Sequence, residues 1–385
     1  MDRRVADAMK PFFEGNYGNP SSLHWIGREA HEALDAARQK VADLLHAKPN
    51  EIYFTASGTE ADNLALIGLS QSLGIIRTRI VTGMTEHPAI LETCRYLEKC
   101  GAEVVYLPVN QDGIIEPAAL KKAIRPKASI VSIMMANNVV GTIQPVEELA
   151  RIAHEHGALF HTDAVQAAGK IPIDVQKQKI DLLSLSGHKF HGPKGVGALY
   201  VRDGIKLSPI IFGGGQEHGL RSATENLAGI AGLACAAELA VSDMADETVR
   251  LIRLRDKIVE SISRTIPNAY LIGHPYHRLP GHLCLGFAGL EGEAIKLLLI
   301  LDELGFAVSS GSACSSNHAG EPSHVLLAMG FDPARARGSL RVTLGRFNTE
   351  PEVDRFLSVL PDAVGKLKPT MTTFQSESNF ERGAL

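Results

Sequence analysis

The chain has 385 residues, 45% of them hydrophobic, enough for two or three globular domains with a sizeable core. Its 39 basic and 43 acidic residues leave a net charge of −4, which gives no long-range attraction to nucleic acid or anionic membranes. No apolar run reaches the ~18 residues of a membrane span, and residues 1–13 lack the apolar stretch of a signal peptide. We therefore expect a cytoplasmic protein that binds neither nucleic acid nor a membrane.

Between residues 50 and 202, short β-branched runs alternate with amphipathic stretches, which is typical of a parallel sheet between helices. The predicted strands are Glu51–Phe54, Arg79–Thr82, Glu103–Pro108, Ser129–Met135, Ala158–His161, Leu182–Leu185 and Gly197–Val201. The predicted helices are Gly58–Ser72, Pro88–Gly101, Pro117–Ile124 and Pro145–Gly157. Polar residues follow several of these strands, at the ends where open α/β sheets bind ligands.

The pattern changes after Gly213–Gly215, and a long helical connector is predicted from Asn226 to about Arg264. A smaller α+β domain follows, with these predicted elements: strand Leu283–Phe287, helix Glu293–Leu304, Ser/Gly loop Ser309–Ser316, strand Ser339–Leu344 and a last helix from Glu352. We predict a large domain over residues 14–250, a small domain from residues 1–13 and 251–370, and a flexible tail over 371–385.

Lys189 lies in a Gly/Pro-rich turn directly after a predicted buried strand. A lysine there can form a Schiff base if its surroundings lower its pKa, although a single loop lysine is usually only solvated. Asp163 ends the preceding strand and could hold the ring nitrogen of a pyridine cofactor protonated, and Gln166 could hydrogen-bond the same ring. Viewed alone, Asp163 could equally cap the next helix.

A strand also ends in small hydroxylated residues at Ser57–Glu60, where a helix begins. The backbone amides of that helix start, with the hydroxyls of Ser57 and Thr59, form a site suited to phosphate. The segment is not a nucleotide P-loop, because no Gly-Lys-Ser/Thr follows it. Ser-x-x-Glu is also an ordinary capping box, so this signal alone is weak.

Cys314 lies in a polar Ser/Gly tract, which favours a reactive thiol over a core residue. Cys235 and Cys284 lie in apolar stretches, and Cys94 and Cys100 lie in a predicted helix. We interpret these four as structural. Five unevenly spaced cysteines do not form a disulfide framework in a chain of this length.

Together these segments resemble the cysteine desulfurases of the NifS/IscS type, in class V of the fold-type-I pyridoxal-phosphate (PLP) aminotransferase superfamily. The resemblance extends from Gly18 to about Glu352. Its motifs are Ser57-Gly-Thr-Glu-Ala-Asp-Asn, Thr85-Glu-His, Asn137-Asn138, His161-Thr-Asp-Ala-Val-Gln, Ser186-Gly-His-Lys, Gly213-Gly-Gly-Gln-Glu, Arg221-Ser-Ala-Thr and Ser309-Ser-Gly-Ser-Ala-Cys. It implies an α/β PLP-binding domain with a mainly parallel seven-stranded sheet, and a smaller α+β domain.

The resemblance implies that Lys189 binds PLP covalently, that Asp163 pairs with the pyridine nitrogen and that Gln166 contacts the ring-hydroxyl side. His87 would stack on the ring and transfer protons. The residues implied to hold the phosphate are Gly58, Thr59, Ser186 and His188, with Thr224 contributed by the partner subunit of a homodimer.

On the substrate side, the resemblance implies that Asn138 binds the substrate–cofactor adduct and that Arg341 binds the carboxylate of L-cysteine. Lys189 would move the α-proton, and Cys314 would attack the substrate sulfur, leaving a persulfide and releasing L-alanine. His87 is our candidate acceptor for the Cys314 proton. The sulfur would pass to an acceptor protein such as an iron–sulfur scaffold.

The chain also departs from the family pattern. Family members begin with a short strand that lines the active site, whereas this sequence starts at Met1-Asp-Arg-Arg, after that strand. Val139, His191 and Ala223 replace the usual Glu, Tyr and Gly of three motifs. The missing strand motivates an alternative in which the protein is a non-catalytic scaffold.

Two further alternatives remain open. A selenocysteine lyase or a class V aminotransferase would use the same cofactor, but a transaminase has no need of a thiol on a loop. A zinc site among His154, His156, His161, His188 and His191 is disfavoured, because positions i and i+2 of a helix point apart. We expect no bound metal.

Overall fold

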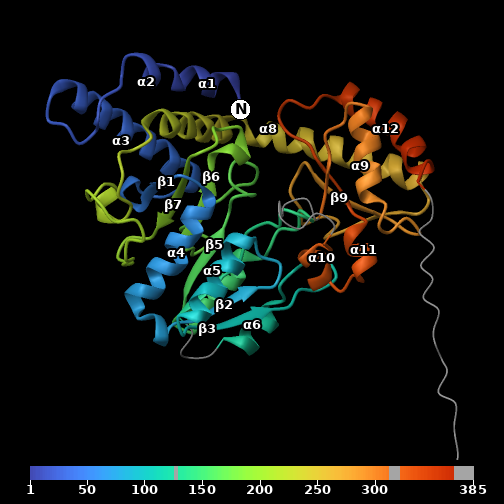
Figure 1. Ribbon diagram of the computed structural model, residues 1–385, viewed down its shortest axis with the longest axis horizontal. Helices are drawn as coiled ribbons and strands as arrows, with labels where there is room; N and C mark the ends of the chain where they lie inside the picture. The colour runs from blue at the N-terminus through green and yellow to red at the C-terminus, as the bar shows by residue number, and fades with distance from the viewer. Residues whose placement is uncertain (125–128, 312–320, 368–385) are drawn as a thin grey trace, which may run out of the picture.

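The computed structural model describes residues 1–124, 129–311 and 321–367, and contains two sheets connected by helix α8 (Figure 1). The strands of the larger sheet are β1 (Ile52–Thr55), β2 (Arg79–Gly83), β3 (Glu103–Leu107), β4 (Ile130–Ser132), β5 (Leu159–Asp163), β6 (Leu182–Ser186) and β7 (Gly197–Val201). Their order is β1-β7-β6-β5-β4-β2-β3. The β6-β5-β4-β2-β3 part is parallel, whereas β7 is antiparallel to both of its neighbours.

Both faces of this sheet are covered, so its central strands are buried in nearly every position. Neighbouring residues of one strand pack into different cores: Val81 and Leu183 into one, Ile80 and Leu182 into the other. The first core is covered by α3 (Trp25–Leu45), α6 (Pro117–Ala123), α7 (Val146–Glu155) and the first half of α8 (Leu227–Thr265). The second is covered by α4 (Gly58–Leu73) and α5 (Pro88–Lys99).

The smaller sheet is antiparallel, in the order β10-β11-β9-β8. Its strands are β8 (Ala269–Leu271), β9 (His282–Phe287), β10 (Ser309–Ser310) and β11 (Leu340–Thr343). One face packs on the second half of α8 together with α9 (Ala294–Glu303) and α12 (Glu350–Gly365). The other face packs on Val139 and Val140, with α10 (His324–Ala328) and α11 (Pro333–Arg337). Each sheet therefore has its own core, and the two meet near residue 140.

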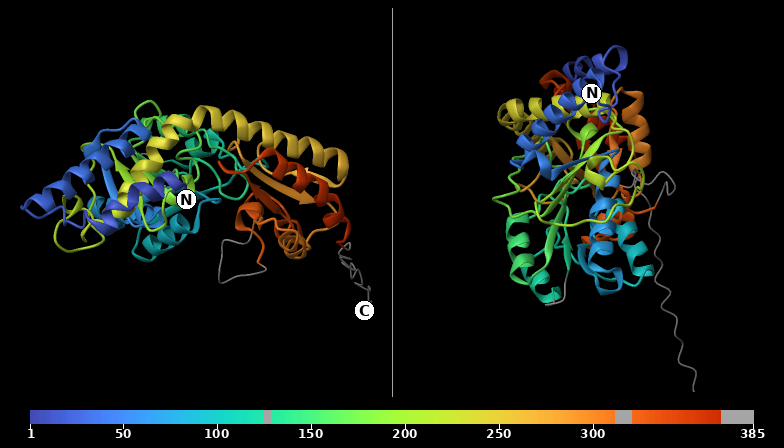
Figure 2. Two further views of the ribbon diagram at one scale, coloured as in Figure 1. Left: turned by 90° about the horizontal axis from the view of Figure 1, so that it is seen from above. Right: turned by 90° about the vertical axis from the view of Figure 1, so that its left-hand side faces the viewer.

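Helix α8 runs along both sheets as one uninterrupted element of 39 residues (Figure 2). By length and composition it contains an 18-residue window apolar enough to cross a membrane, a window that the sequence analysis did not recognise. In the structure 56% of that window is buried inside the protein, as in a core helix that packs on α3.

The predicted strands and helices of residues 50–202 are all present, with ends shifted by a few residues. The sequence analysis did not predict α1 (Arg3–Met9), α2 (Pro11–Glu14) or α3. It was wrong to begin a loop at Ser309, because Ser309–Ser310 pair with β11 as β10. The division into domains stays a prediction, and its boundary at residue 250 lies inside the continuous α8. The predicted tail lies outside the described residues.

Candidate active site

A cavity of about 600 Å³ lies where the carboxyl ends of β5 and β6 face β11 and the loop after it. Ten of the twelve predicted site residues line it: Gly58, Thr59, His87, Asn138, Asp163, Gln166, Ser186, His188, Lys189 and Arg341. Thr224 is exposed and does not line this cavity, and Cys314 lies outside the described residues. Residues far apart in the sequence are therefore brought together by the fold.

The start of α4 forms one end of the cavity. The N-cap Ser57 accepts a hydrogen bond from the Glu60 amide at 3.1 Å, which leaves the first amides of the helix to face the cavity. A Cβ at Gly58 would lie only 2.5 Å from Val165 Cγ2, so the start of α4 packs directly against the turn after β5. Nearby, the Ser186 hydroxyl and the His188 ring are 3.0 Å apart. These donors suit an anion such as phosphate.

Asp163 is a buried carboxylate at the end of β5. Its Oδ1 accepts a hydrogen bond from the Val165 amide at 2.8 Å, and burial raises its pKa to about 6. None of the lysines, arginines or histidines that the structure describes forms an ion pair with it. A carboxylate in this position favours a cationic N–H group brought by a ligand.

Lys189 lies in a single 3-10 turn, Gly187–Phe190, that follows β6. Phe190 is buried and anchors the turn in the core, while Lys189 is half-buried and lines the cavity. The turn ends at His191, which has a left-handed φ of 70° and whose amide donates a hydrogen bond to the Gly187 carbonyl, so the chain reverses direction here. The lysine amine is therefore presented from a rigid support.

His87 is the N-cap of α5, and its Nδ1 accepts a hydrogen bond from the Ala89 amide at 3.1 Å. Burial and, less strongly, the ammonium of Lys189 lower its pKa to about 4, so the ring is neutral at pH 7. A neutral ring whose Nδ1 accepts carries its proton on Nε2. At rest Nε2 of His87 thus offers a hydrogen-bond donor to the cavity, and it can accept a proton only after losing the one already there.

Arg341 projects from β11 toward the cavity. It donates hydrogen bonds to the carbonyl of Asn138 at 3.0 Å and to the Ser309 hydroxyl at 3.2 Å. These contacts fix a planar guanidinium in a wall of the cavity. A guanidinium held in this way is suited to a carboxylate, which it can bind with two parallel hydrogen bonds.

The amino-acid sequence matches the family described as aminotransferase class V over residues 1–356. The chain belongs to this family. It is 48% identical over 366 residues to the cysteine desulfurase IscS of Methanosarcina thermophila, covering 95% of this chain and 90% of the relative. It is 47% identical over 377 residues to the cysteine desulfurase IscS of Dictyoglomus turgidum, covering 98% and 95%. A solved NifS-like protein superposes with a TM-score of 0.89 at 40% identity, covering 95% and 97%.

Cysteine desulfurases of the class V aminotransferase family use PLP, so the predicted family, fold and cofactor are confirmed. The cavity fits this cofactor. Lys189 can bind its aldehyde, Asp163 can pair with its ring nitrogen, and the start of α4 can receive its phosphate. Asp62 also lines the cavity, and its buried Oδ1 lies 3.7 Å from His161 Nε2 without a hydrogen-bond partner among the described residues.

The histidines that suggested a zinc site have other partners. His154 lies 2.6 Å from an Asp181 carboxylate oxygen, and His156 contacts the Ile152 carbonyl at 2.9 Å. His161 is buried between the hydroxyls of Ser132 and Ser184. Across residues 1–124, 129–311 and 321–367, no group of three or more His, Cys, Asp or Glu side chains could hold a metal ion.

Several residues that line the cavity were not predicted from the sequence, namely Asp62, Lys170, His282 and, from the loop at 345–348, Gly345, Phe347 and Asn348. Lys170 follows Asp163 and Gln166 on the same turn, so a search of that turn for further polar residues could have found it. No sequence pattern indicated His282 or the loop at 345–348, because only the packing of the small sheet brings them to the cavity.

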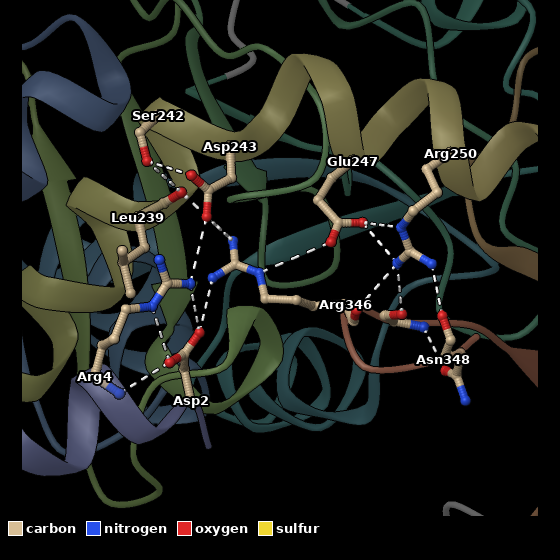
Figure 3. Close-up of polar contacts among 10 residues, drawn as sticks. Asp2, Arg4, Leu239, Ser242, Asp243, Glu247, Arg250, Arg346 and Asn348 are labelled. Carbon is tan, nitrogen blue, oxygen red and sulfur yellow. Dashed lines mark hydrogen bonds and ion pairs between the residues drawn. The ribbon is translucent and has the colours of Figure 1, made fainter.

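A network of charged side chains, which we call the clasp, joins the N-terminal segment, α8 and the loop at 345–348 (Figure 3). Its members are Asp2, Arg4, Asp243, Glu247, Arg250 and Arg346. The Arg346 guanidinium lies 3.0 Å from an Asp2 oxygen and 3.3 Å from an Asp243 oxygen. Only 14% of the Arg346 side chain is exposed, so these ion pairs are partly shielded from water.

The clasp connects two walls of the cavity. Arg250 donates to the carbonyls of Gly345 and Arg346, both at 3.1 Å, and to that of Asn348 at 2.6 Å. On the other side, the Asp2 amide donates to the His191 carbonyl at 2.9 Å, two residues after Lys189. The turn of Lys189 and the loop after β11 are thereby held to the same group of charges.

We expect Arg346→Met to lower the free energy of unfolding by about 1–3 kcal/mol, because charge-assisted hydrogen bonds lose their donor while Asp2 stays buried. Urea denaturation at pH 7 measures this. The matched control is Arg264→Met, whose ion pair with Glu260 is exposed and is worth at most about 0.5 kcal/mol. Arg4 and then Arg346 hold the pKa of Asp2 below its usual range, so the Asp2 contribution is present above about pH 4 and lost in acid. Equal effects of the two variants at pH 7 would contradict this role.

Proposed function

We propose that the protein is a PLP-dependent cysteine desulfurase, which converts L-cysteine to L-alanine and carries the sulfur as a persulfide on Cys314. The observation that supports this most directly is the presence of an amine, a buried carboxylate and an oriented guanidinium in one cavity: Lys189, Asp163 and Arg341. Two relatives that match nearly the whole chain bear the name cysteine desulfurase.

In this proposal Arg341 binds the carboxylate of the substrate, which orients the α-carbon toward Lys189. Lys189 removes the α-proton as a general base, and Asp163 keeps the cofactor's ring nitrogen protonated. When bound, PLP supplies an electron sink for the pair released from the α-carbon. The roles of these residues follow from their places in the cavity and from the family resemblance.

Sulfur then moves from the substrate to Cys314. The Cys314 thiolate forms a sulfur–sulfur bond to the substrate while the bond between the substrate's β-carbon and sulfur breaks. The electron pair of the broken bond stays on carbon, which takes up a proton and becomes the methyl group of alanine. Cysteine and the enzyme thiol thus give alanine and the enzyme persulfide. His87, whose Nε2 carries a hydrogen, can donate a hydrogen bond within this cavity.

We further propose a cytoplasmic homodimer that delivers sulfur to an acceptor protein such as an iron–sulfur scaffold. The segment from residue 13 to 25 supports a partner subunit, since it exposes four large apolar side chains: Phe13, Tyr17, Leu23 and Trp25. Thr224 is also exposed and lies away from the cavity of its own chain. This placement suits a residue that would reach the phosphate of a partner.

The decisive test is mass spectrometry of the PLP-loaded protein after exposure to L-cysteine. We expect an added sulfur atom on Cys314, and Cys314→Ser is expected to lose it while keeping the visible absorbance of bound cofactor. Cys100→Ser is the matched control, because this half-buried thiol ends α5 and does not line the cavity. Alanine production without a persulfide would favour the lyase alternative, and a 2-oxo acid product in place of alanine would favour the aminotransferase. Absence of all these products would favour a non-catalytic scaffold.

A further inference from the structure

Lys170 is a second amine in the active-site cavity that the proposed mechanism does not use. It lies on the turn after β5, four residues beyond Gln166, and it also lines a smaller pocket that adjoins the cavity. Within the described parts of the chain no Asp or Glu side chain forms an ion pair with it. A half-buried lysine without such a partner is costly to keep, so another contact has to account for its position.

The backbone of Lys170 is fixed on two sides. Its carbonyl accepts a hydrogen bond from the Thr248 hydroxyl of α8 at 3.4 Å. The preceding Gly169 has a left-handed φ of 71° and packs so closely that a Cβ there would lie 2.6 Å from Phe190 Cβ. Phe190 belongs to the same turn as Lys189. The two lysines are therefore carried by segments that pack on each other.

The ammonium of Lys170 contacts the side chain of Gln166, with 3.2 Å between Nζ and Oε1. An ammonium group donates hydrogen bonds and has no lone pair to accept one. The atom of Gln166 that faces Lys170 is therefore the carbonyl oxygen. The side-chain amide is planar and forked, so its NH₂ group lies on the branch that does not contact Lys170. Gln166 lines the cavity. The contact decides which end of the amide a ligand meets.

We propose that Lys170 is a positioning residue, which holds Gln166 as a hydrogen-bond donor toward the phenolic oxygen of bound PLP. Gln166 follows Asp163 by three residues on the same turn, so its side chain can reach a pyridine ring that pairs with Asp163. The phenolic oxygen is the acceptor next to the aldehyde that Lys189 binds, and a donor there stabilises its deprotonated form. This inference rests on the proposed function.

The surroundings of Lys170 leave its amine protonated, and so able to donate a hydrogen bond, at neutral pH. Burial and then the ammonium of Lys189 lower its pKa to about 8, so it is still mainly protonated at pH 7. The other groups facing the same space are His191 beside Lys189, His282 of β9, Glu247 of α8 and Arg346 of the clasp. Burial lowers the pKa of His282 to about 3, so this ring remains neutral there.

The test is a pH titration of the visible absorbance of the PLP-loaded protein, for wild type, Lys170→Met, Lys170→Arg, Gln166→Ala and the Lys170→Met/Gln166→Ala double variant. Without the oriented donor, the phenolic oxygen holds its proton more strongly, so Lys170→Met is expected to raise the midpoint by about 0.5–1 pH unit. Lys170→Arg keeps the positive charge and the hydrogen-bond donors, so its midpoint should equal that of the wild-type protein. In the Gln166→Ala background, Lys170→Met should have no further effect.

Each outcome has a distinct meaning. If the double variant shifts beyond Gln166→Ala alone, Lys170 acts through its charge and not through Gln166, which overturns the proposal. An unchanged midpoint in Lys170→Met, with a normal wild-type titration, also overturns it and leaves the proposed function intact. If the wild-type protein takes up no PLP, the proposed function fails first. The absorbance midpoint does not depend on turnover, so slow catalysis does not obscure the result.

Discussion

Lys189→Ala is expected to abolish the PLP absorbance that stays with the protein through gel filtration and to lower desulfurase activity by at least about 10³-fold. The variant removes both the covalent attachment and the general base, because the same amine performs both tasks in the proposed function. The other residues of the cavity stay in place, so phosphate contacts still permit reversible binding. Gel filtration after loading with PLP, followed by an absorbance spectrum, separates covalent from reversible binding.

Lys194→Ala is the matched control for this experiment. Lys194 lies five residues further along the same loop, is exposed and does not line the cavity. It should keep the absorbance and the activity of the wild-type protein. Retention of bound colour and persulfide formation in Lys189→Ala would show that another amine carries the cofactor. Lys170, the second amine in the cavity, would then be the first to test.

The second large effect concerns stability. Arg38 of α3 and Glu217 form a bidentate ion pair with both N–O distances at 2.8 Å, and their side chains are only 8% and 2% exposed. Glu217 also accepts a hydrogen bond from the Phe54 amide of β1. Arg38→Met leaves this carboxylate buried without its counter-charge, so we expect the free energy of unfolding to fall by about 3–5 kcal/mol. Urea denaturation followed by circular dichroism measures the loss.

Lys40→Met provides the control on the same helix, since its ion pair with Glu238 is largely exposed and should contribute less than about 1 kcal/mol. The double variant Arg38→Met/Glu217→Gln removes both charges, and its cost should be smaller than the sum of the single effects. A loss in Arg38→Met no larger than that in Lys40→Met would contradict the importance of the buried pair. Glu217 has a left-handed φ of 48°, so its pairing also holds an unfavourable backbone conformation.

Nine of the ten predicted residues that line the cavity could be found from the sequence because they end or follow strands or begin helices. Strand ends of a parallel sheet meet at one edge, so residues as distant as Thr59 and Lys189 become neighbours without any knowledge of side-chain packing. Arg341 could be assigned only through the family resemblance, since nothing in its local sequence places β11 beside the large sheet.

The remaining parts of the site depend on packing between distant segments. The clasp joins residue 2 to residues 243 and 346, and no local pattern indicates such pairs. The contact of Lys170 with Gln166 required the turn geometry after β5. Helix α3 was missed although Ala30, Leu34, Ala37 and Val41 recur at helical spacing on its buried face. That signal was in the sequence.

Helix α8 imposes a strict constraint on chain length. At 1.5 Å per residue its 39 residues extend about 58 Å, and the clasp residues Asp243, Glu247 and Arg250 lie near its middle. One residue inserted directly after Arg250 would rotate everything beyond it by about 100° and advance it by about 1.5 Å. The small sheet would then turn Arg341 away from Lys189, although every catalytic side chain would still be encoded. Functional variants of this chain should therefore tolerate substitutions along the helix far better than insertions or deletions.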